Sequence, residues 1–128
     1  MPEKKNQKPI ERAIDIFKEN LDTVARVTEW AELMGYERPK RFSRHFLHYY
    51  GRRPQQVLVR IRLCSITKEI RTCQKKYYQI ARSHSLPDEK ALNNFTRRHI
   101  GYPPSKIKTM DENELQELLE GSESKNGE

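Results

Sequence analysis

The chain has 128 residues, which is enough for one domain or two very small lobes. Its 25 Lys and Arg outnumber its 18 Asp and Glu, for a formal net charge of +7. No segment approaches the ~18 to 20 consecutive apolar residues of a membrane span, and no apolar run near Met1 resembles a signal peptide. Two cysteines are too few for a disulfide scaffold and lack zinc-site spacing. We therefore expect a cytoplasmic protein without cofactors, metals or a membrane partner.

The charge is unevenly distributed along the chain. Residues 35–76 sum to +10 and residues 77–110 to +4, whereas residues 1–34 sum to −1 and residues 111–128 to −6. A middle this cationic favours a polyanionic partner, with nucleic acid first and an anionic membrane surface second.

Apolar residues recur at steps of three and four while strand-like alternation is nearly absent, so the sequence predicts an all-α fold. Several expected helices begin at a proline or end before a glycine, as helices commonly do. In chain order, we expect helices from about residue 9 to 21, up to 34, and at 39–50, 54–73, 76–84, 87–100 and 104–110.

The inward faces of these helices predict the core. The first helix would bury Ile10, Ala13, Ile14, Phe17 and Leu21. The helices around residues 30–50 and 87–100 would bury Trp30, Phe42, Phe46, Tyr49, Leu92, Phe95 and His99.

An internal repeat appears when the chain is shifted by fifty residues against itself. Four identities align without a gap, Ala31 with Ala81, Lys40 with Lys90, Gly51 with Gly101 and Pro54 with Pro104, and the apolar positions around them agree. Each unit is a short helix, a tight turn at Gly35 or Ser85, and a longer helix. This is the helix-turn-helix pattern.

Residues 54–73 join the two units and carry two apolar stripes. One stripe holds Val59, Leu63, Ile66, Ile70 and Cys73, and the nearly opposite stripe holds Val57, Ile61 and Cys64. A helix with two such stripes is packed on both sides, so we place it between the lobes. Its length of roughly 30 Å approximates one DNA turn of ~34 Å. We therefore expect two reading heads in successive major grooves.

Polar side chains on the outward faces of two helices form the candidate DNA-reading surface. Arg and Lys suit guanine, Asn suits adenine, and Leu can pack on a thymine methyl group. The residues expected to contact bases are Lys40, Ser43, Arg44 and Leu47 in the first unit and Lys90, Asn93, Asn94 and Arg97 in the second.

A second set of residues is suited to the DNA backbone. Helix amino termini favour anions, and phosphate contacts set the register without reading sequence. The candidates lie around the helix starts at Pro54 and Pro104 and before the first reading helix: Arg38, Arg41, Arg52, Arg53, Gln55, Gln56, Ser105, Lys106 and Lys108.

The order of these residues resembles the DNA-binding domain of the AraC/XylS family of bacterial transcription regulators, across roughly residues 8–110. The resemblance is carried by Gly35-Tyr36, Phe42-Ser43-Arg44-His45-Phe46, Gly51, Pro54 and Arg62-Leu63. It implies two helix-turn-helix lobes joined by a long helix, and it implies base contacts by Lys40, Ser43 and Arg44 and by the matching Lys90, Asn93 and Asn94. Many members also carry a sensory domain, and we expect no ligand sensing within these 128 residues.

The second unit departs from the family pattern. Ser85 stands where glycine is usual, Thr96 where a second aromatic residue is usual, and Asn94 where arginine is common. We therefore expect the first lobe to dominate specificity.

The acidic tail begins with Asp111 and Glu114 at capping-box spacing and continues with three leucines on one side of a short helix. Beyond Gly121 we expect disorder. The tail is either a frayed, solubilising end, or it folds onto the cationic face and competes with DNA, or it docks a protein. The expected divisions are 1–53 for the N-terminal helix and first lobe, 54–75 for the linking helix, 76–110 for the second lobe and 111–128 for the tail.

These inferences together predict a monomeric, sequence-specific regulator bound to double-stranded DNA at the nucleoid, with RNA polymerase as a further candidate partner. No phosphate loop, nucleophile-and-base spacing or carboxylate pair indicates an enzyme. Two alternatives stay open: a protein-interaction module that keeps the fold without reading DNA, and a nonspecific architectural DNA-binding protein.

Overall fold

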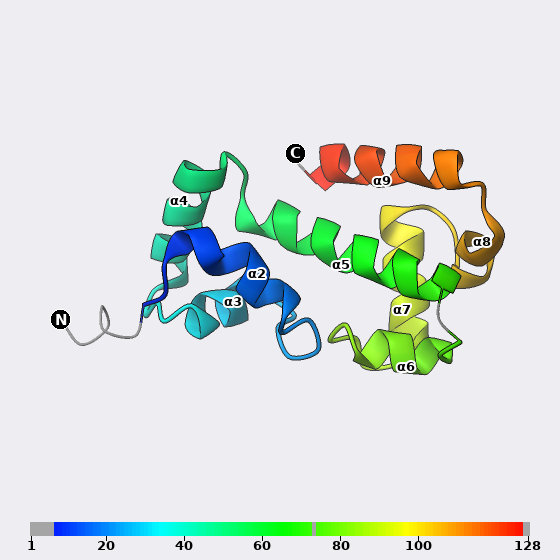
Figure 1. Ribbon diagram of the computed structural model, residues 1–128, viewed down its shortest axis with the longest axis horizontal. Helices are drawn as coiled ribbons and strands as arrows, with labels where there is room; N and C mark the ends of the chain where they lie inside the picture. Colours follow the sequence, from blue (N-terminus) through cyan, green and yellow to red (C-terminus); the bar gives the residue numbers. More distant parts are fainter. Residues whose placement is uncertain (1–6, 73, 127–128) are drawn as a thin grey trace.

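The computed structural model describes residues 7–72 and 74–126, and within them the fold is all-helical, as predicted (Figure 1). The expected end of the linking helix at Cys73 lies outside the described residues. In chain order the elements are a short 3-10 turn η1 (Ile10–Arg12), α2 (Ala13–Lys18), α3 (Val27–Leu33), α4 (Pro39–Tyr50), α5 (Pro54–Thr72), α6 (Tyr77–Arg82), α7 (Glu89–His99), α8 (Pro104–Thr109) and α9 (Glu112–Asn126).

The first lobe is built around Trp30. Its indole ring is fully buried, stacks on Phe17 at 4.8 Å between ring centroids, and lies within 5.4 Å of the rings of Phe42 and Phe46. The indole N–H donates to the carbonyl oxygen of Ala13 at 3.0 Å, which satisfies its polar atom inside the core. Aromatic packing of this kind fixes α3 and α4 against α2 and leaves the opposite face of α4 to solvent.

The second lobe repeats the first at the fifty-residue offset. Tyr36 donates its backbone N–H to the Ala31 carbonyl at 3.0 Å, and Leu86 does the same to Ala81 at 2.9 Å. The turn residue between them has a positive φ in both lobes, +88° at Gly35 and +66° at Ser85. The helices before the turns are also capped alike, by side-chain oxygens of Glu29 and Gln79 on the backbone N–H groups three residues before. The fifty-residue repeat predicted from the sequence is therefore also seen in the backbone structure of the two lobes.

The linking helix α5 belongs to both cores. Leu58 and Val59 are buried in the core of the first lobe, whereas Leu63, Ile66 and Ile70 are buried in that of the second. The expected position between the lobes is therefore confirmed. The two apolar stripes do not correspond to the two lobes, because the division between the cores runs along the helix: Val57 and Ile61 also pack on the first core, and Cys64 packs on the second.

Three residues expected in the core, Tyr49, Phe95 and His99, are not fully buried. Tyr49 is 56% exposed. Tyr50 takes the inner place instead, because its ring packs on Phe46 at 4.3 Å and its hydroxyl donates to the Ile10 carbonyl at 2.9 Å. In the second lobe the fully buried residue at the place of Phe46 is Thr96.

Phe95 and His99 are only half-buried, since they turn towards the junction of the lobes, where their rings lie 4.6 Å apart. Ile16, which sequence periodicity did not select, joins the first core.

The acidic tail forms helix α9, which lies along α5 (Figure 1). Asp111 caps it by accepting from the backbone N–H groups of Asn113 and Glu114 at 3.0 and 3.2 Å. Leu115 and Leu119 are buried in the second core, and the Arg60 guanidinium donates to the Leu119 carbonyl at 2.8 Å. The helix continues through Gly121, beyond which disorder was expected, and the first part of the tail is an integral part of the second lobe.

We predict that Leu115→Ala lowers the free energy of unfolding by about 2 to 3 kcal/mol, because it removes buried methyl groups and leaves a cavity under α9. Urea denaturation measures the loss. Gln116→Ala, an exposed neighbour on the same helix, is the control and should change stability by less than about 0.5 kcal/mol. Equal stability of the two variants would mean that α9 does not pack on α5 in solution.

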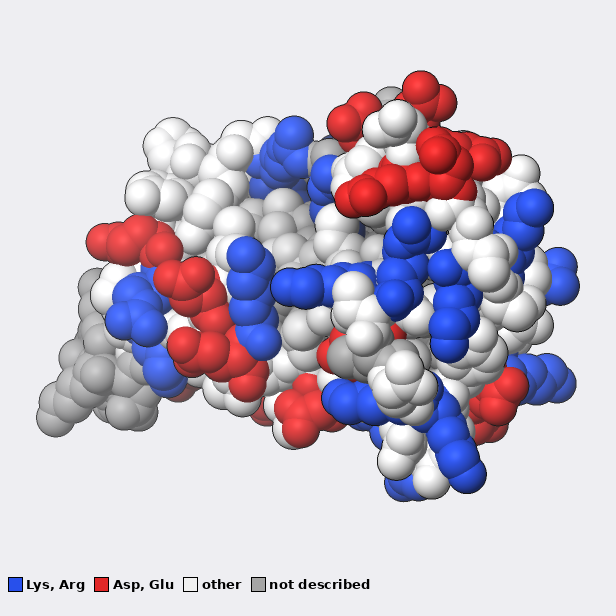
Figure 2. Space-filling model, turned by 45° about the vertical axis from the view of Figure 1, so that its right-hand side comes forward, with Lys and Arg blue, Asp and Glu red and all other residues white. Residues whose placement is uncertain are grey.

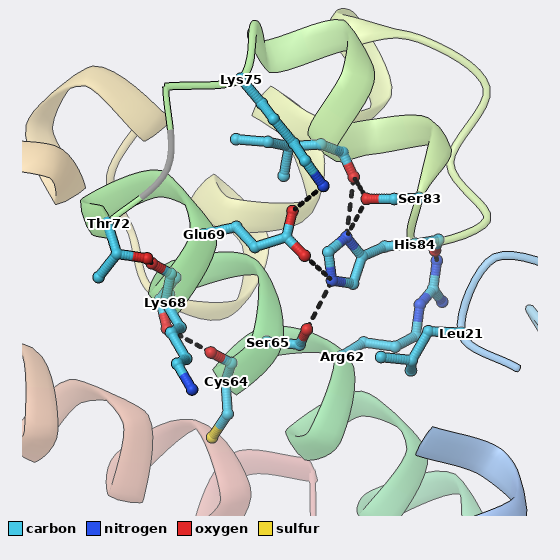
Figure 3. Close-up of polar contacts among 12 residues, drawn as sticks. Leu21, Arg62, Cys64, Ser65, Lys68, Glu69, Thr72, Lys75, Ser83 and His84 are labelled. Carbon is cyan, nitrogen blue, oxygen red and sulfur yellow. Dashed lines mark hydrogen bonds and ion pairs between the residues drawn. The ribbon is translucent and has the colours of Figure 1, made fainter. Parts of the chain in front are cut away.

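A buried polar cluster joins α5 to the turn after α6 (Figure 3). His84 is 1% exposed, and its Nδ1 lies 2.8 Å from the carbonyl oxygen of Ile80. A carbonyl only accepts, so Nδ1 carries the hydrogen and Nε2 accepts from the Ser65 hydroxyl at 2.7 Å. Burial lowers the pKa of His84, against the opposing effects of the Ile80 bond and of the Glu69 carboxylate, 3.9 Å away. The imidazole is held in its neutral form.

This cluster makes stability fall in mild acid. The unfolded chain titrates His84 near its ordinary pKa of 6.5, while the folded chain titrates it lower. The unfolded state therefore binds more protons as the pH drops below 6.5, and the contribution present above that value is lost. His84→Gln should flatten the decline of unfolding free energy between pH 7 and pH 5, measured by urea denaturation. An unchanged slope in His84→Gln relative to the wild type would contradict the assignment.

Candidate nucleic-acid interface

Helix α4 presents the predicted first reading surface to solvent. Lys40, Arg44 and Leu47 are exposed and Ser43 is half-buried, because the opposite face of the helix is committed to the aromatic core. Leu47 is 45% exposed, which is unusual for leucine and leaves an apolar group among the cations.

A hollow of about 480 Å³ joins the predicted base-contacting residues of α4 to the predicted phosphate-contacting residues at the start of α5. Val27, Leu47 and Pro54 form its apolar part. Its other lining residues are Ser43, Arg44, Arg53 and Gln55. Members of two sets chosen separately from the sequence therefore line one hollow, which combines apolar groups with the cationic side chains of Arg44 and Arg53.

A second hollow, of about 460 Å³, lies at the other side of α4. Its lining residues are four cationic side chains and one histidine: Arg38, Lys40, Arg41, Arg44 and His45. The imidazole is oriented by Tyr36, whose hydroxyl lies 3.1 Å from Nδ1, and burial raises the pKa of that tyrosine. The hollow concentrates positive charge where an anion can approach.

Helix α7 presents the second predicted surface, with Lys90, Asn94 and Arg97 exposed. Two of its predicted base-contacting side chains are bonded to each other, because the Arg97 Nε donates to the Asn93 side-chain oxygen at 3.3 Å. The amino terminus also differs: Asp88 caps α7 by accepting from the Ala91 N–H at 2.9 Å, whereas cationic residues surround the start of α4. The second helix is therefore less attractive to an anion at its start.

The cleft between the lobes connects the two surfaces. It has a volume of about 440 Å³, with Gln55, Leu58, Val59 and Arg62 of α5 on one side and Ala91, Asn94, Phe95 and Arg98 of α7 on the other. Gln55 lines both this cleft and the hollow beside α4. Through Gln55, the hollow beside Ser43, Arg44 and Leu47 of α4 adjoins the cleft that Asn94 of α7 lines.

Two cations of this cleft were missed by sequence reasoning. Arg62 is 7% exposed, and burial lowers its pKa while the charge of Glu29 opposes the shift. Its guanidinium lies over the Phe95 ring at 5.2 Å. Arg98 is exposed at the rim. Outward periodicity on α7 could have found Arg98, whereas Arg62 stood out only through the family resemblance.

The remaining predicted phosphate-contacting residues lie near the starts of α5 and α8. Arg52, Ser105, Lys106 and Lys108 are exposed. Gln56 is half-buried, and its side-chain oxygen accepts from the Arg53 N–H at 3.0 Å, so this group caps α5. Lys106 lies over the Tyr102 ring at 5.9 Å.

Helix α9 lies on the side of α5 away from the cleft. The α5 residues beside it, such as Cys64, Lys68 and Arg71, are about half a helical turn from Val59 and Arg62, which line the cleft. Figure 2 shows the acidic side chains gathered along α9, with Lys and Arg side chains beside them. The described part of the tail thus packs on the second lobe through Leu115 and Leu119, and not over the predicted reading face.

Among residues 7–72 and 74–126 no three metal-binding side chains of the His, Cys, Asp or Glu type come together. Within the same residues no helix has both the length and the apolar character that crossing a bilayer requires.

The fold is similar to those of solved DNA-binding domains. The DNA-binding domain of the global transcriptional factor AdpA, solved in complex with a target DNA, is similar with a TM-score of 0.66 and 22% identity, over 80% of this chain and 91% of that one. An AraC-type transcriptional regulator from Chromobacterium violaceum is similar with a TM-score of 0.62 and 17% identity, over 77% and 88%.

No family model and no curated protein matches the sequence. The two structural neighbours nevertheless share one arrangement with this chain over most of its length. The chain has the fold of AraC-type DNA-binding domains, with two helix-turn-helix lobes on one linking helix.

Proposed function

We propose that this protein is a sequence-specific, double-stranded DNA-binding transcription regulator that reads two successive major grooves as a monomer. The observation that supports the proposal is that Gln55 lines both the hollow beside Ser43, Arg44 and Leu47 of α4 and the cleft beside Asn94 of α7, so that residues of both predicted sets border connected hollows. Both structural neighbours are described as transcriptional regulators, and one of them was solved on DNA.

The length of α5 supports the proposal, because it is close to the distance between successive major grooves. Helix α5 has 19 residues and spans about 28 Å at ~1.5 Å per residue. Successive major grooves on one side of B-form DNA are ~34 Å apart. Two lobes carried at the ends of this helix would meet adjacent grooves with a modest curvature of the duplex, and proteins that bend DNA gain specificity from its deformability.

The two lobes would contribute unequally to DNA recognition. Exposed arginine and lysine residues line a hollow at α4, while α7 is capped by Asp88, begins with Glu89 and has Arg97 bonded to Asn93. The first lobe would therefore supply most of the sequence discrimination, and the second would supply a weaker, amide-based contact suited to adenine. Action in the cytoplasm at the nucleoid, with RNA polymerase as a partner, follows from this role and stays a prediction.

Arg44→Ala should weaken binding to a selected site by about 1 to 3 kcal/mol and leave binding to random duplex nearly unchanged, because a base contact is lost. Fluorescence anisotropy on both duplexes at one salt concentration measures the difference. Lys18→Ala, an exposed cation on α2 outside the proposed surface, is the control for loss of charge alone. Equal losses on both duplexes would remove the base-reading role of Arg44.

Arg53→Ala should weaken binding to every DNA sequence by a similar factor, because one phosphate contact is lost. In a salt titration, the slope of log K against log salt concentration should become shallower by about one unit.

A salt titration of the wild type tests the proposed function as a whole. A steep slope with tight binding to sites selected from random duplexes supports the proposal. A steep slope without selection would indicate an architectural DNA-binding protein, and the absence of DNA binding at low salt would indicate a protein-interaction module.

A further inference from the structure

The turn before α7 contains the one non-glycine residue with positive φ among the residues that the structure describes. Ser85 has φ of +66°, a conformation in which a side chain is strained and glycine is not. At the equivalent place in the first lobe the chain has Gly35, at +88°. The first lobe avoids this strain by having glycine at the same place, so the serine side chain is expected to make a contact that compensates for the strain.

The Ser85 hydroxyl reaches the other lobe. It donates to the carbonyl oxygen of Leu21 at 2.6 Å, across 64 positions of sequence. Leu21 lies in the loop between α2 and α3, so the bond ties the turn of the second helix-turn-helix to the supporting loop of the first. Glycine at this position could not make the bond.

A second tie lies beside the first. Arg62 donates to the carbonyl oxygen of His84 in the second lobe at 2.8 Å and approaches that of Ala25 in the first at 3.4 Å. Figure 3 shows Arg62 beside His84, with Leu21 close by. Residues 84–85 are thus linked to residues 21–25 by two side chains, one from α5 and one from the turn itself.

Each lobe packs on its own part of α5, so their relative orientation changes when that helix bends or twists or when a lobe shifts on it. A bond placed off the axis of α5 opposes such changes. Ser85 is well placed for this, because α7 begins at Glu89, only four residues later. A shift of the turn would therefore be passed directly to the second reading helix.

We propose that Ser85 is a positioning residue that fixes the orientation of the second lobe relative to the first and thereby sets the half-site spacing that the protein accepts. The inference rests on the proposed DNA-reading function and adds a determinant of specificity that touches no base.

Two substitutions separate this role from an effect on folding. Ser85→Gly removes the hydroxyl and relieves the strain, whereas Ser85→Ala removes the hydroxyl and keeps the strain. If the serine acted only on stability, the two variants would differ from each other. If it sets orientation, both would behave alike. Ser83→Ala is the matched control, because the Ser83 hydroxyl donates to Ile80 within its own lobe, at 2.9 Å.

The first measurement uses the full chain and a duplex selected by the wild type, together with the same duplex lengthened or shortened by one base pair between the half-sites. We expect the wild type and Ser83→Ala to prefer the selected spacing by tenfold or more in Kd. In both Ser85 variants this preference should fall at least threefold, while binding to a duplex with the first half-site alone is unchanged. Wild-type spacing preference in both Ser85 variants would overturn the inference.

The second measurement needs no DNA. Residual dipolar couplings of the free protein report the orientation of each lobe through its alignment tensor. We expect one common tensor for both lobes in the wild type and in Ser83→Ala, and two different tensors in Ser85→Gly and Ser85→Ala. If the wild type selects no DNA site, the proposed function fails and these couplings alone decide whether Ser85 fixes the lobes. A common, wild-type tensor in the Ser85 variants would overturn the inference.

Discussion

The architecture depends on one helix completing two hydrophobic cores. Neither lobe has enough residues to bury a sufficient apolar surface alone, since domains this small are marginal without an additional partner. Helix α5 supplies that partner to both, through Leu58 and Val59 at one end and Ile66 and Ile70 at the other. The relative placement of the two lobes is therefore a consequence of how each one folds, and a change in α5 acts on both cores at once.

Much of the fold could be predicted because its boundaries rest on local chemistry. Proline starts α4 and α5, and the left-handed glycine at position 51 ends α4. The choice between neighbouring aromatic residues could not be predicted in the same way. Tyr49 and Tyr50 lie three and four positions after Phe46, and both spacings suit an inward face. The carbonyl of Ile10, supplied by a distant segment, selects Tyr50.

The candidate site shows a similar division between local and tertiary information. Outward residues of α4 and α7 followed from amphipathic spacing, so their exposure was predictable. The hollow that joins Arg44 to Arg53 was not, because it forms only when α4 packs at its observed angle to α5. The serine at position 85 looked like a departure from the family pattern. Its contact with Leu21 lies between two turns, where periodicity carries no information.

The position of α9 brings acidic side chains close to basic ones. Lys68 and Arg71 of α5 line the same hollow as Glu112 of α9, and Figure 2 shows Lys and Arg side chains beside the acidic residues. Opposite charges this close partly cancel each other's potential in the surrounding solvent. The electrostatic potential beside α9 is therefore weaker than at α4, where four cationic side chains line one hollow.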